Sequence, residues 1–143
     1  MSTLYDTDVV AWALEQVDLL RRGKFAELDI ENIASEIEEV GKNEHRGLAS
    51  RLTVLLGHLL KWRYQPSHRS QSWIRTIDDQ RRVIARKLKK MPGLKPLLSD
   101  AEWLDEVWVD AVKLAADETG IVEFPHACPW PIDEVLDPGF LPT

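Results

Sequence analysis

Three side chains, Glu36, Glu39 and His58, are of the types that carry metal or proton-transfer chemistry. Carboxylate oxygens and imidazole nitrogens bind divalent metals, and the same groups act as general acids and bases. A di-iron helical bundle, however, repeats Glu-x-x-His on two helices, and this chain has that spacing only at residues 123–126, in a proline-rich stretch. A metal-dependent or acid–base enzyme is therefore the second alternative, and we predict no catalytic residue, no metal site and no cofactor.

A structural role is favoured for the same residues. Glu36 lies beside an apolar stripe, near Ile33 and Ile37, and His58 lies among leucines, where an ionised group needs a partner. We expect His58 to donate to a backbone carbonyl or a carboxylate, and Glu36 to pair with Arg81 or Arg69. The apolar stripe of the helix over residues 70–90 has a gap at Arg81 or Gln80 that would project a polar group inward. The sequence thus predicts a buried structural polar network, whose members are Glu36, His58, Arg69 and Arg81.

Cys128 and His126 resemble a nucleophile with its base only in their separation along the chain. No helix start is evident there to stabilise a thiolate, so we predict a small buried thiol. Because Cys128 is the only cysteine, an intramolecular disulfide and a cysteine-based zinc site are both excluded. This cysteine usage favours a reducing, cytoplasmic location.

The charge is unevenly distributed along the 143 residues. Residues 1–41 carry 3 basic and 10 acidic side chains, residues 42–95 carry 14 and 3, and residues 96–143 carry 1 and 11; the segment charges −7, +11 and −10 sum to −6. Four basic residues share one face of the predicted third helix, and we call them the basic ridge: Arg75, Arg82, Arg86 and Lys89. A basic face fits an acidic partner, nucleic acid, or an acidic helix of the same protein.

Nucleic acid is the alternative partner of the ridge, with Trp62 and Trp73 available to stack on unpaired bases. The pI of about 5.2 and the absence of a nucleic-acid-binding motif count against it. Packing at a helical corner is the favoured role of both tryptophans, and Arg69 is expected to hold backbone carbonyls or a carboxylate at that corner.

Apolar residues recur at helical spacing throughout, and no segment alternates like a strand, so we predict an all-α fold. The pattern gives four main helices, over residues 7–22, 29–65, 70–90 and 99–119, in an antiparallel up-down bundle. Gly41, Asn43 and Gly47 argue for a break in the second helix, but its stripe stays in phase, which favours one continuous helix and leaves a kink near 41–43 open.

The tail over residues 121–143 holds five of the eight prolines and should be irregular, with one helical turn at 133–136. Its aromatic and aliphatic residues would be costly to leave in water, so we expect the tail to pack on the bundle or on a partner subunit. The whole chain is expected to form a single helical domain, residues 1–143. The amino-terminal segment does not resemble a signal peptide, and no apolar stretch is long enough for a membrane span.

Several separate motifs occur in the order and near the spacing of a known family. They are YDTDVVAWALEQVDLLRRG, LDIENIASEIEEVG, SRLTVLLGHLLKW, QPSHRSQSWIRTIDDQR, AADETG and FPHACPW, together with the Pro92-Gly93-Leu94 step. From Tyr5 to about Pro142 the chain resembles the family called domain of unknown function 29, found mostly in bacteria, including cyanobacteria. The resemblance implies a compact helical domain and brings no activity, substrate or cofactor.

These observations lead us to predict a non-enzymatic protein-interaction or regulatory module. The basic ridge is the expected contact for an acidic protein partner, and a nucleic-acid-associated protein using the same ridge is the alternative. The predicted helix over 99–119 has an apolar face wider than a small bundle buries, so we also expect a homo-oligomer, most simply a dimer.

Overall fold

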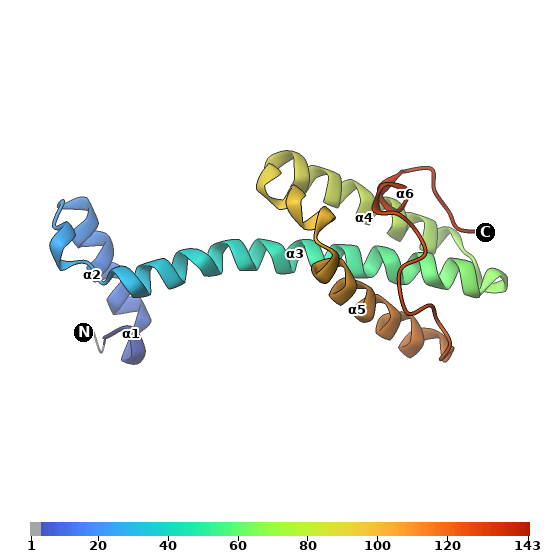
Figure 1. Ribbon diagram of the computed structural model, residues 1–143, viewed down its shortest axis with the longest axis horizontal. Helices are drawn as coiled ribbons and strands as arrows, with labels where there is room; N and C mark the ends of the chain where they lie inside the picture. The colour runs from blue at the N-terminus through green and yellow to red at the C-terminus, as the bar shows by residue number, and fades with distance from the viewer. Residues whose placement is uncertain (1–3) are drawn as a thin grey trace. The chain divides into compact units, whose positions relative to one another are not determined.

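A computed structural model of the chain describes residues 4–143, which form helices and irregular segments without a strand (Figure 1). The predicted all-α class is confirmed. Backbone contacts divide the chain into two compact units, the first ending at Asn43 and the second beginning at Glu44. The helices are α1 (Leu4–Thr7), α2 (Val9–Arg21), α3 (Ile30–Tyr64), α4 (Gln71–Lys90), α5 (Ala101–Thr119) and α6 (Ile132–Leu136), with 3-10 turns at Phe25–Glu27, Pro66–His68 and Pro92–Ser99.

The predicted helix over residues 7–22 is α2, which begins two residues later because a different residue caps it. The spacing favours Asp6 or Thr7 as the cap, but the carboxylate of Asp8 accepts a hydrogen bond from the Ala11 amide at 3.0 Å. Asp6 and Thr7 belong to the short helix α1. The helix ends before Gly23, as predicted.

Helix α3 is uninterrupted from Ile30 to Tyr64, as the phase of its apolar stripe predicted. Asp29 precedes it, and its carboxylate accepts from the side-chain amide of Asn32 at 2.7 Å. Pro66 follows the last helical residue by two positions. Proline disfavours the α conformation in the residue before it, which accounts for the end of the helix.

Helices α4 and α5 begin and end where the sequence predicts. The Ser70 hydroxyl and the Asp100 carboxylate each accept from a tryptophan amide three residues on, at 3.2 Å in both cases. Gly120 follows α5 with φ of 76°, a left-handed conformation that favours glycine. These caps fix the ends of the two helices that surround the second unit's core.

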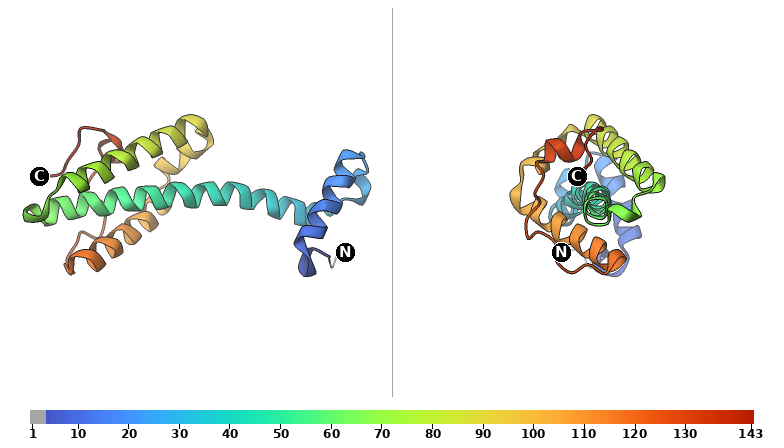
Figure 2. Two further views of the ribbon diagram at one scale, coloured as in Figure 1. Left: turned by 180° about the vertical axis from the view of Figure 1, so that it is seen from behind. Right: turned by 90° about the vertical axis from the view of Figure 1, so that its right-hand side faces the viewer.

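The core of residues 44–143 is built on the leucines of α3, with α4 and α5 on either side of that part of the helix (Figure 2). Gly57 lets α3 and α5 approach, because a Cβ there would lie 2.6 Å from Leu114 Cδ2. The fully buried large side chains are Leu48, Leu52, Leu55, Leu59, Leu60, Ile77, Ile84, Val107, Trp108 and Val135.

The tail packs against this core. Val135 of α6 is buried, and the indole nitrogen of Trp108 donates to the Pro125 carbonyl at 3.0 Å. Trp130 makes edge-to-face contacts with both Trp108 and Phe140, with ring centroids 6.1 Å apart in each case. Aromatic residues thus hold the irregular tail in place through a part of the chain that has little regular backbone hydrogen bonding.

The unit formed by residues 4–43 has few buried residues, and polar contacts hold its helices together. Its buried residues are Trp12 and Gln16, both from α2. The Trp12 indole donates to the Asp29 carboxylate at 2.9 Å, and the Gln16 side-chain carbonyl accepts from the Asp29 amide at 2.8 Å. Tyr5 packs edge-to-face on Trp12, with centroids 4.7 Å apart. Polar contacts centred on Asp29 therefore hold α2 to the start of α3.

The predicted up-down bundle of four helices is not confirmed. Helix α2 belongs to the unit of residues 4–43, whereas α4 and α5 share a core with the part of α3 beyond Glu44. Three of the apolar residues whose spacing predicted α2, Val9, Val17 and Leu20, are exposed. Whether residues 1–143 act as a single domain stays a prediction. No helix within residues 4–143 combines the length and apolar composition that crossing a bilayer requires.

Candidate functional site

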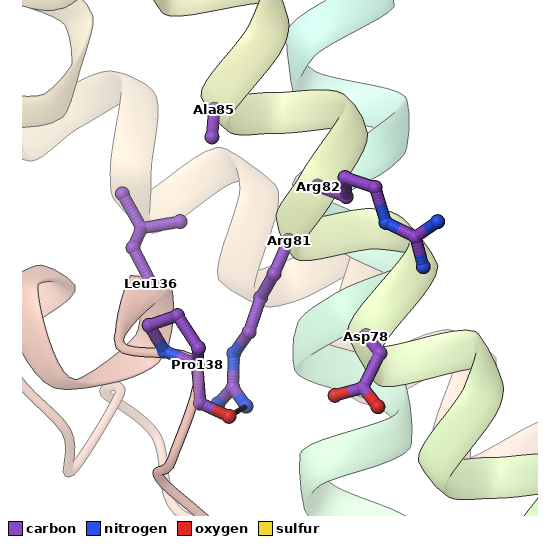
Figure 3. Close-up of a pocket in the computed structure, with 6 residues that line it drawn as sticks. All are labelled: Asp78, Arg81, Arg82, Ala85, Leu136 and Pro138. Atoms are coloured by element: carbon purple, nitrogen blue, oxygen red, sulfur yellow. Dashed lines mark hydrogen bonds between the residues drawn. The ribbon is translucent and has the colours of Figure 1, made fainter.

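A cleft of about 400 Å³ opens between α4 and the tail (Figure 3). Helix α4 supplies the aliphatic stems of two arginines, the methyl group of an alanine and the carboxylate of an aspartate. The tail supplies Leu136 and Pro138. The walls are mainly apolar. The residues that line the cleft are Asp78, Arg81, Arg82, Ala85, Leu136 and Pro138.

Arg81 forms the inner wall of the cleft and joins α4 to the tail. Its Nε donates to the Val135 carbonyl at 2.9 Å, and its Nη1 and Nη2 donate to the carbonyls of Pro138 at 3.3 Å and Phe140 at 2.7 Å. The residue is 5% exposed. Burial lowers the pKa of the guanidinium, which remains charged because an arginine is not deprotonated in a protein. The gap in the α4 stripe is therefore occupied by Arg81, not by Gln80.

The predicted pairing of Glu36 with Arg81 or Arg69 stays a prediction, because Glu36 belongs to the unit that ends at Asn43 and both arginines belong to the other. Glu36 is half-buried, and its carboxylate accepts a hydrogen bond from the Tyr5 hydroxyl at 2.6 Å. The hydrogen bond to Glu36 raises the pKa of Tyr5. Arg81 donates to three backbone carbonyls of the tail, those of Val135, Pro138 and Phe140.

His58 is half-buried, and its Nδ1 lies 2.9 Å from the Val54 carbonyl of the preceding helical turn. A carbonyl oxygen only accepts, so Nδ1 carries the proton, and the predicted donation to a backbone carbonyl is present. Burial is the main cause of a lowered His58 pKa, and nearby Lys61 lowers it further. The ring is consequently neutral near pH 7.

Arg69 is exposed, so the predicted buried network is wrong for this member. Its Nε donates to the Trp62 carbonyl at 2.8 Å, and its guanidinium carbon lies 4.8 Å from the centroid of the Trp62 ring. It thus holds a carbonyl at the corner between α3 and α4, as predicted. The partners of the four residues are Tyr5 for Glu36 and backbone carbonyls for His58, Arg69 and Arg81.

No three His, Cys, Asp or Glu side chains within residues 4–143 are placed to hold a metal ion together. Glu36, Glu39 and His58 accordingly form no such group. Cys128 is half-buried, with its Sγ donating to the Trp130 carbonyl at 3.3 Å. Burial raises the pKa of this thiol, which keeps it protonated and poorly nucleophilic.

All four members of the basic ridge are exposed on α4: Arg75, Arg82, Arg86 and Lys89. Arg82 also lines the cleft, and its guanidinium points away from Arg81 (Figure 3). Asp79 accepts from Arg82 at 2.8 Å, in a pair exposed on both sides and therefore weak. The neighbouring Lys87 is turned toward α3, where it contacts Glu44 at 3.4 Å.

Sequence reasoning missed two features of this region. The cleft was not predicted, because it needs Pro138 and Leu136 of the tail to lie against α4. The ion pair between Lys61 and Glu118 was also missed. Lys61 is 7% exposed and lies 5.1 Å from the centroid of the Trp73 ring. Its position directly after the buried Leu59 and Leu60 was the available signal.

The fold and the site define an all-helical protein with a basic helix face beside an apolar cleft. The model of the family described as domain of unknown function DUF29 matches residues 4–141, so the chain belongs to that family. No curated protein and no solved structure matches it significantly.

Proposed function

We propose that this chain is a non-enzymatic, cytoplasmic protein-interaction module that binds an acidic segment of another protein on α4. Carboxylates of that segment would contact the basic ridge, and an apolar side chain beside them would enter the cleft. The observation that carries the proposal is that Arg82 belongs to both features, as an exposed ridge residue and as part of the cleft lining.

Charge and shape support one ligand for both features. An acidic segment is attracted by the clustered positive charges of α4, and its approach is accelerated at low ionic strength. Ala85, Leu136 and Pro138 give the cleft an apolar lining that rewards an aliphatic or aromatic side chain. Lys87, next to the ridge, contacts Glu44 of α3 instead.

A fluorescently labelled peptide with four glutamates flanking one leucine is a direct probe. Its anisotropy on titration with the full chain should show binding that weakens from 50 to 300 mM NaCl. Changing all four ridge residues to alanine should raise the Kd at least tenfold, as should filling the cleft with Ala85→Trp. A peptide with alanine in place of the leucine should bind several-fold more weakly.

The matched control removes four exposed basic groups elsewhere: Arg51→Ala, Arg63→Ala, Lys95→Ala and Lys113→Ala. Net charge falls equally, so the control should keep most of the affinity if the ridge is the contact. Equal losses in both quadruple variants would contradict the proposal. A single-stranded oligonucleotide that binds more tightly than the peptide at 150 mM NaCl would replace it with the nucleic-acid alternative.

A homodimer remains a prediction that concerns another surface. The apolar face of α5 is largely covered by the core and the tail, but Val109 is 64% exposed and adjoins a second cleft of about 290 Å³. Val112, Val122 and Phe124 line the same cleft. Sedimentation of the parent chain and of Val109→Asp tests whether this patch joins two copies.

A further inference from the structure

Exposed apolar side chains are concentrated in one part of the chain. Nine of the eleven large hydrophobic residues that are strongly exposed lie between residues 9 and 40, and the other two are Val109 and Val122. The nine are Val9, Val10, Leu14, Val17, Leu20, Phe25, Ile30, Ile37 and Val40. Single exposed apolar residues are ordinary, but a concentration of this kind marks an interaction surface.

The unit of residues 4–43 is also too small to supply its own core. Trp12 is its one buried hydrophobic residue, whereas the unit from Glu44 onward has a cluster of fourteen. Domains below about 40 residues usually need disulfides, a metal or association with another chain. This unit has no cysteine, and no group within residues 4–143 is placed to hold a metal. Association is the remaining means of completing it.

The start of α3 offers a regular seam for that association. Ile30, Ile33, Ile37 and Val40 follow the three-and-four spacing of a coiled-coil seam. The same stripe is fully buried further along the helix, at Leu48 and Leu52, where the core covers it. Ile37 and Val40 are each 66% exposed. The seam thus lies in phase with the buried leucines but is separated from them by residues 41–47, which include no large apolar side chain, and it is uncovered.

Charges beside the seam indicate what can cover it. Glu36 flanks the stripe on one edge, and Glu31 and Glu38, both exposed, lie on the helix surface beyond its other edge. The unit as a whole carries ten Asp or Glu and four Lys or Arg between residues 4 and 43, a net charge of −6. Positions flanking a coiled-coil seam select partners by opposite charge, so this seam favours lysine or arginine on the facing helix.

We infer that residues 30–40 of α3 dock an amphipathic helix of a partner protein, with apolar residues at three-and-four spacing and basic residues along its edges. This surface is separate from the ridge of α4 and requires the opposite charge on its partner. A second copy of the chain is the less suitable occupant, because two copies of a unit with a net charge of −6 repel each other. Helix docking of this kind is a recurring mode of peptide recognition.

The probe is a labelled 21-residue helical peptide with isoleucine and leucine at the seam positions and lysine at the flanking positions. A second peptide differs only in having glutamate at the flanks. Anisotropy titrations with the full chain should give a Kd at least tenfold lower for the lysine peptide, and 300 mM NaCl should reduce the difference. Ile37→Ser combined with Val40→Ser should raise the Kd at least tenfold.

Val109→Ser combined with Val122→Ser is the matched control, since it changes two exposed apolar residues outside the unit. It should leave peptide binding unchanged, and circular dichroism should show equal helix content in both double variants. Equal affinity for the two peptides, or no binding of either, would overturn the inference. So would a dimer in sedimentation that Ile37→Ser with Val40→Ser dissociates, because the occupant would then be a second copy.

Discussion

Arg81 and Phe140, 59 residues apart, are joined by a hydrogen bond of 2.7 Å from the guanidinium to the backbone carbonyl. Two further carbonyls of the tail, from Val135 and Pro138, accept from the same side chain. A single buried cation thereby fixes a segment that contains little regular secondary structure. The cleft beside Arg82 exists because this contact holds Pro138 against α4.

Arg81→Met should lower the free energy of unfolding by about 1 to 3 kcal/mol, because the tail carbonyls lose their donors. Urea unfolding followed by circular dichroism measures the change. Arg82→Met, one residue away and exposed, should shift the same curve by less than about 0.5 kcal/mol. Superimposable curves for Arg81→Met and the parent would show that the three hydrogen bonds do not stabilise the fold.

Substitution of Lys61 and substitution of Glu118 should lower the stability of the fold by unequal amounts. The Glu118 side chain is 45% exposed, so Lys61→Met leaves a carboxylate that water can solvate, and stability should change little. Glu118→Gln leaves the buried ammonium of Lys61 without its counter-charge and should destabilise by about 1 to 2 kcal/mol. Thermal melts of both variants at pH 7 provide the comparison, and a larger loss for Lys61→Met would contradict the asymmetry.

His58 should make stability fall as the pH is lowered. Its pKa in the folded protein lies below the usual 6.5, so the unfolded chain binds a proton more readily. The contribution of neutral His58 is complete above the unfolded pKa and is lost as pH falls through the folded pKa. The Tm of the parent should drop between pH 8 and pH 5, and His58→Gln should reduce that drop.

Asp29 should affect the stability of the fold at a lower pH than His58 does, so the two effects can be measured separately. The hydrogen bond from Asn32 is the main cause of its lowered pKa, and Trp12 adds a second donor. The stability it confers is present above the unfolded carboxyl pKa, near 3.8, and is lost as pH falls through the folded pKa.

A His58→Gln variant with the same Tm profile as the parent between pH 8 and pH 5 would contradict the assignment to His58.

Gly57 and Gly41 should differ when each is changed to alanine, although both lie inside α3. No atom lies within 4 Å of a Cβ at Gly41, so Gly41→Ala should gain about 1 kcal/mol of helix stability. At Gly57 the added Cβ would meet Leu114 Cδ2 at 2.6 Å, and displacement of Leu114 should offset that gain. Thermal melts that rise equally for the two variants would show that α3 and α5 are not closely packed at this point.

The sequence was sufficient for the helices because the determinants of helix ends are local. Ser70, Asp100 and Gly120 each act within one turn of the helix end that they cap. The continuity of α3 followed from the phase of a single stripe. Helical periodicity reports which face of a helix is apolar, however, and not whether anything covers it. For that reason the expectation that α2 joins a bundle is not confirmed.

The candidate site was harder to predict because its contacts are distant in the chain. The gap in the α4 stripe identified Arg81 as a buried polar group, but its acceptors are backbone carbonyls, which every residue possesses. Side-chain types therefore suggested Glu36, although Tyr5 is the group that reaches it. The exposure of the ridge was predictable from its spacing on one helix face, whereas the cleft required the path of the tail.

The hydrogen bond between Trp12 and Asp29 gives the first unit an optical signal of its own. Trp12 is the only one of the six tryptophans between residues 4 and 43. In a chain whose other five are replaced by phenylalanine, indole emission would follow local opening around Asp29 without interference from the larger core. Fraying of this small unit and melting of the larger one then become separately observable events.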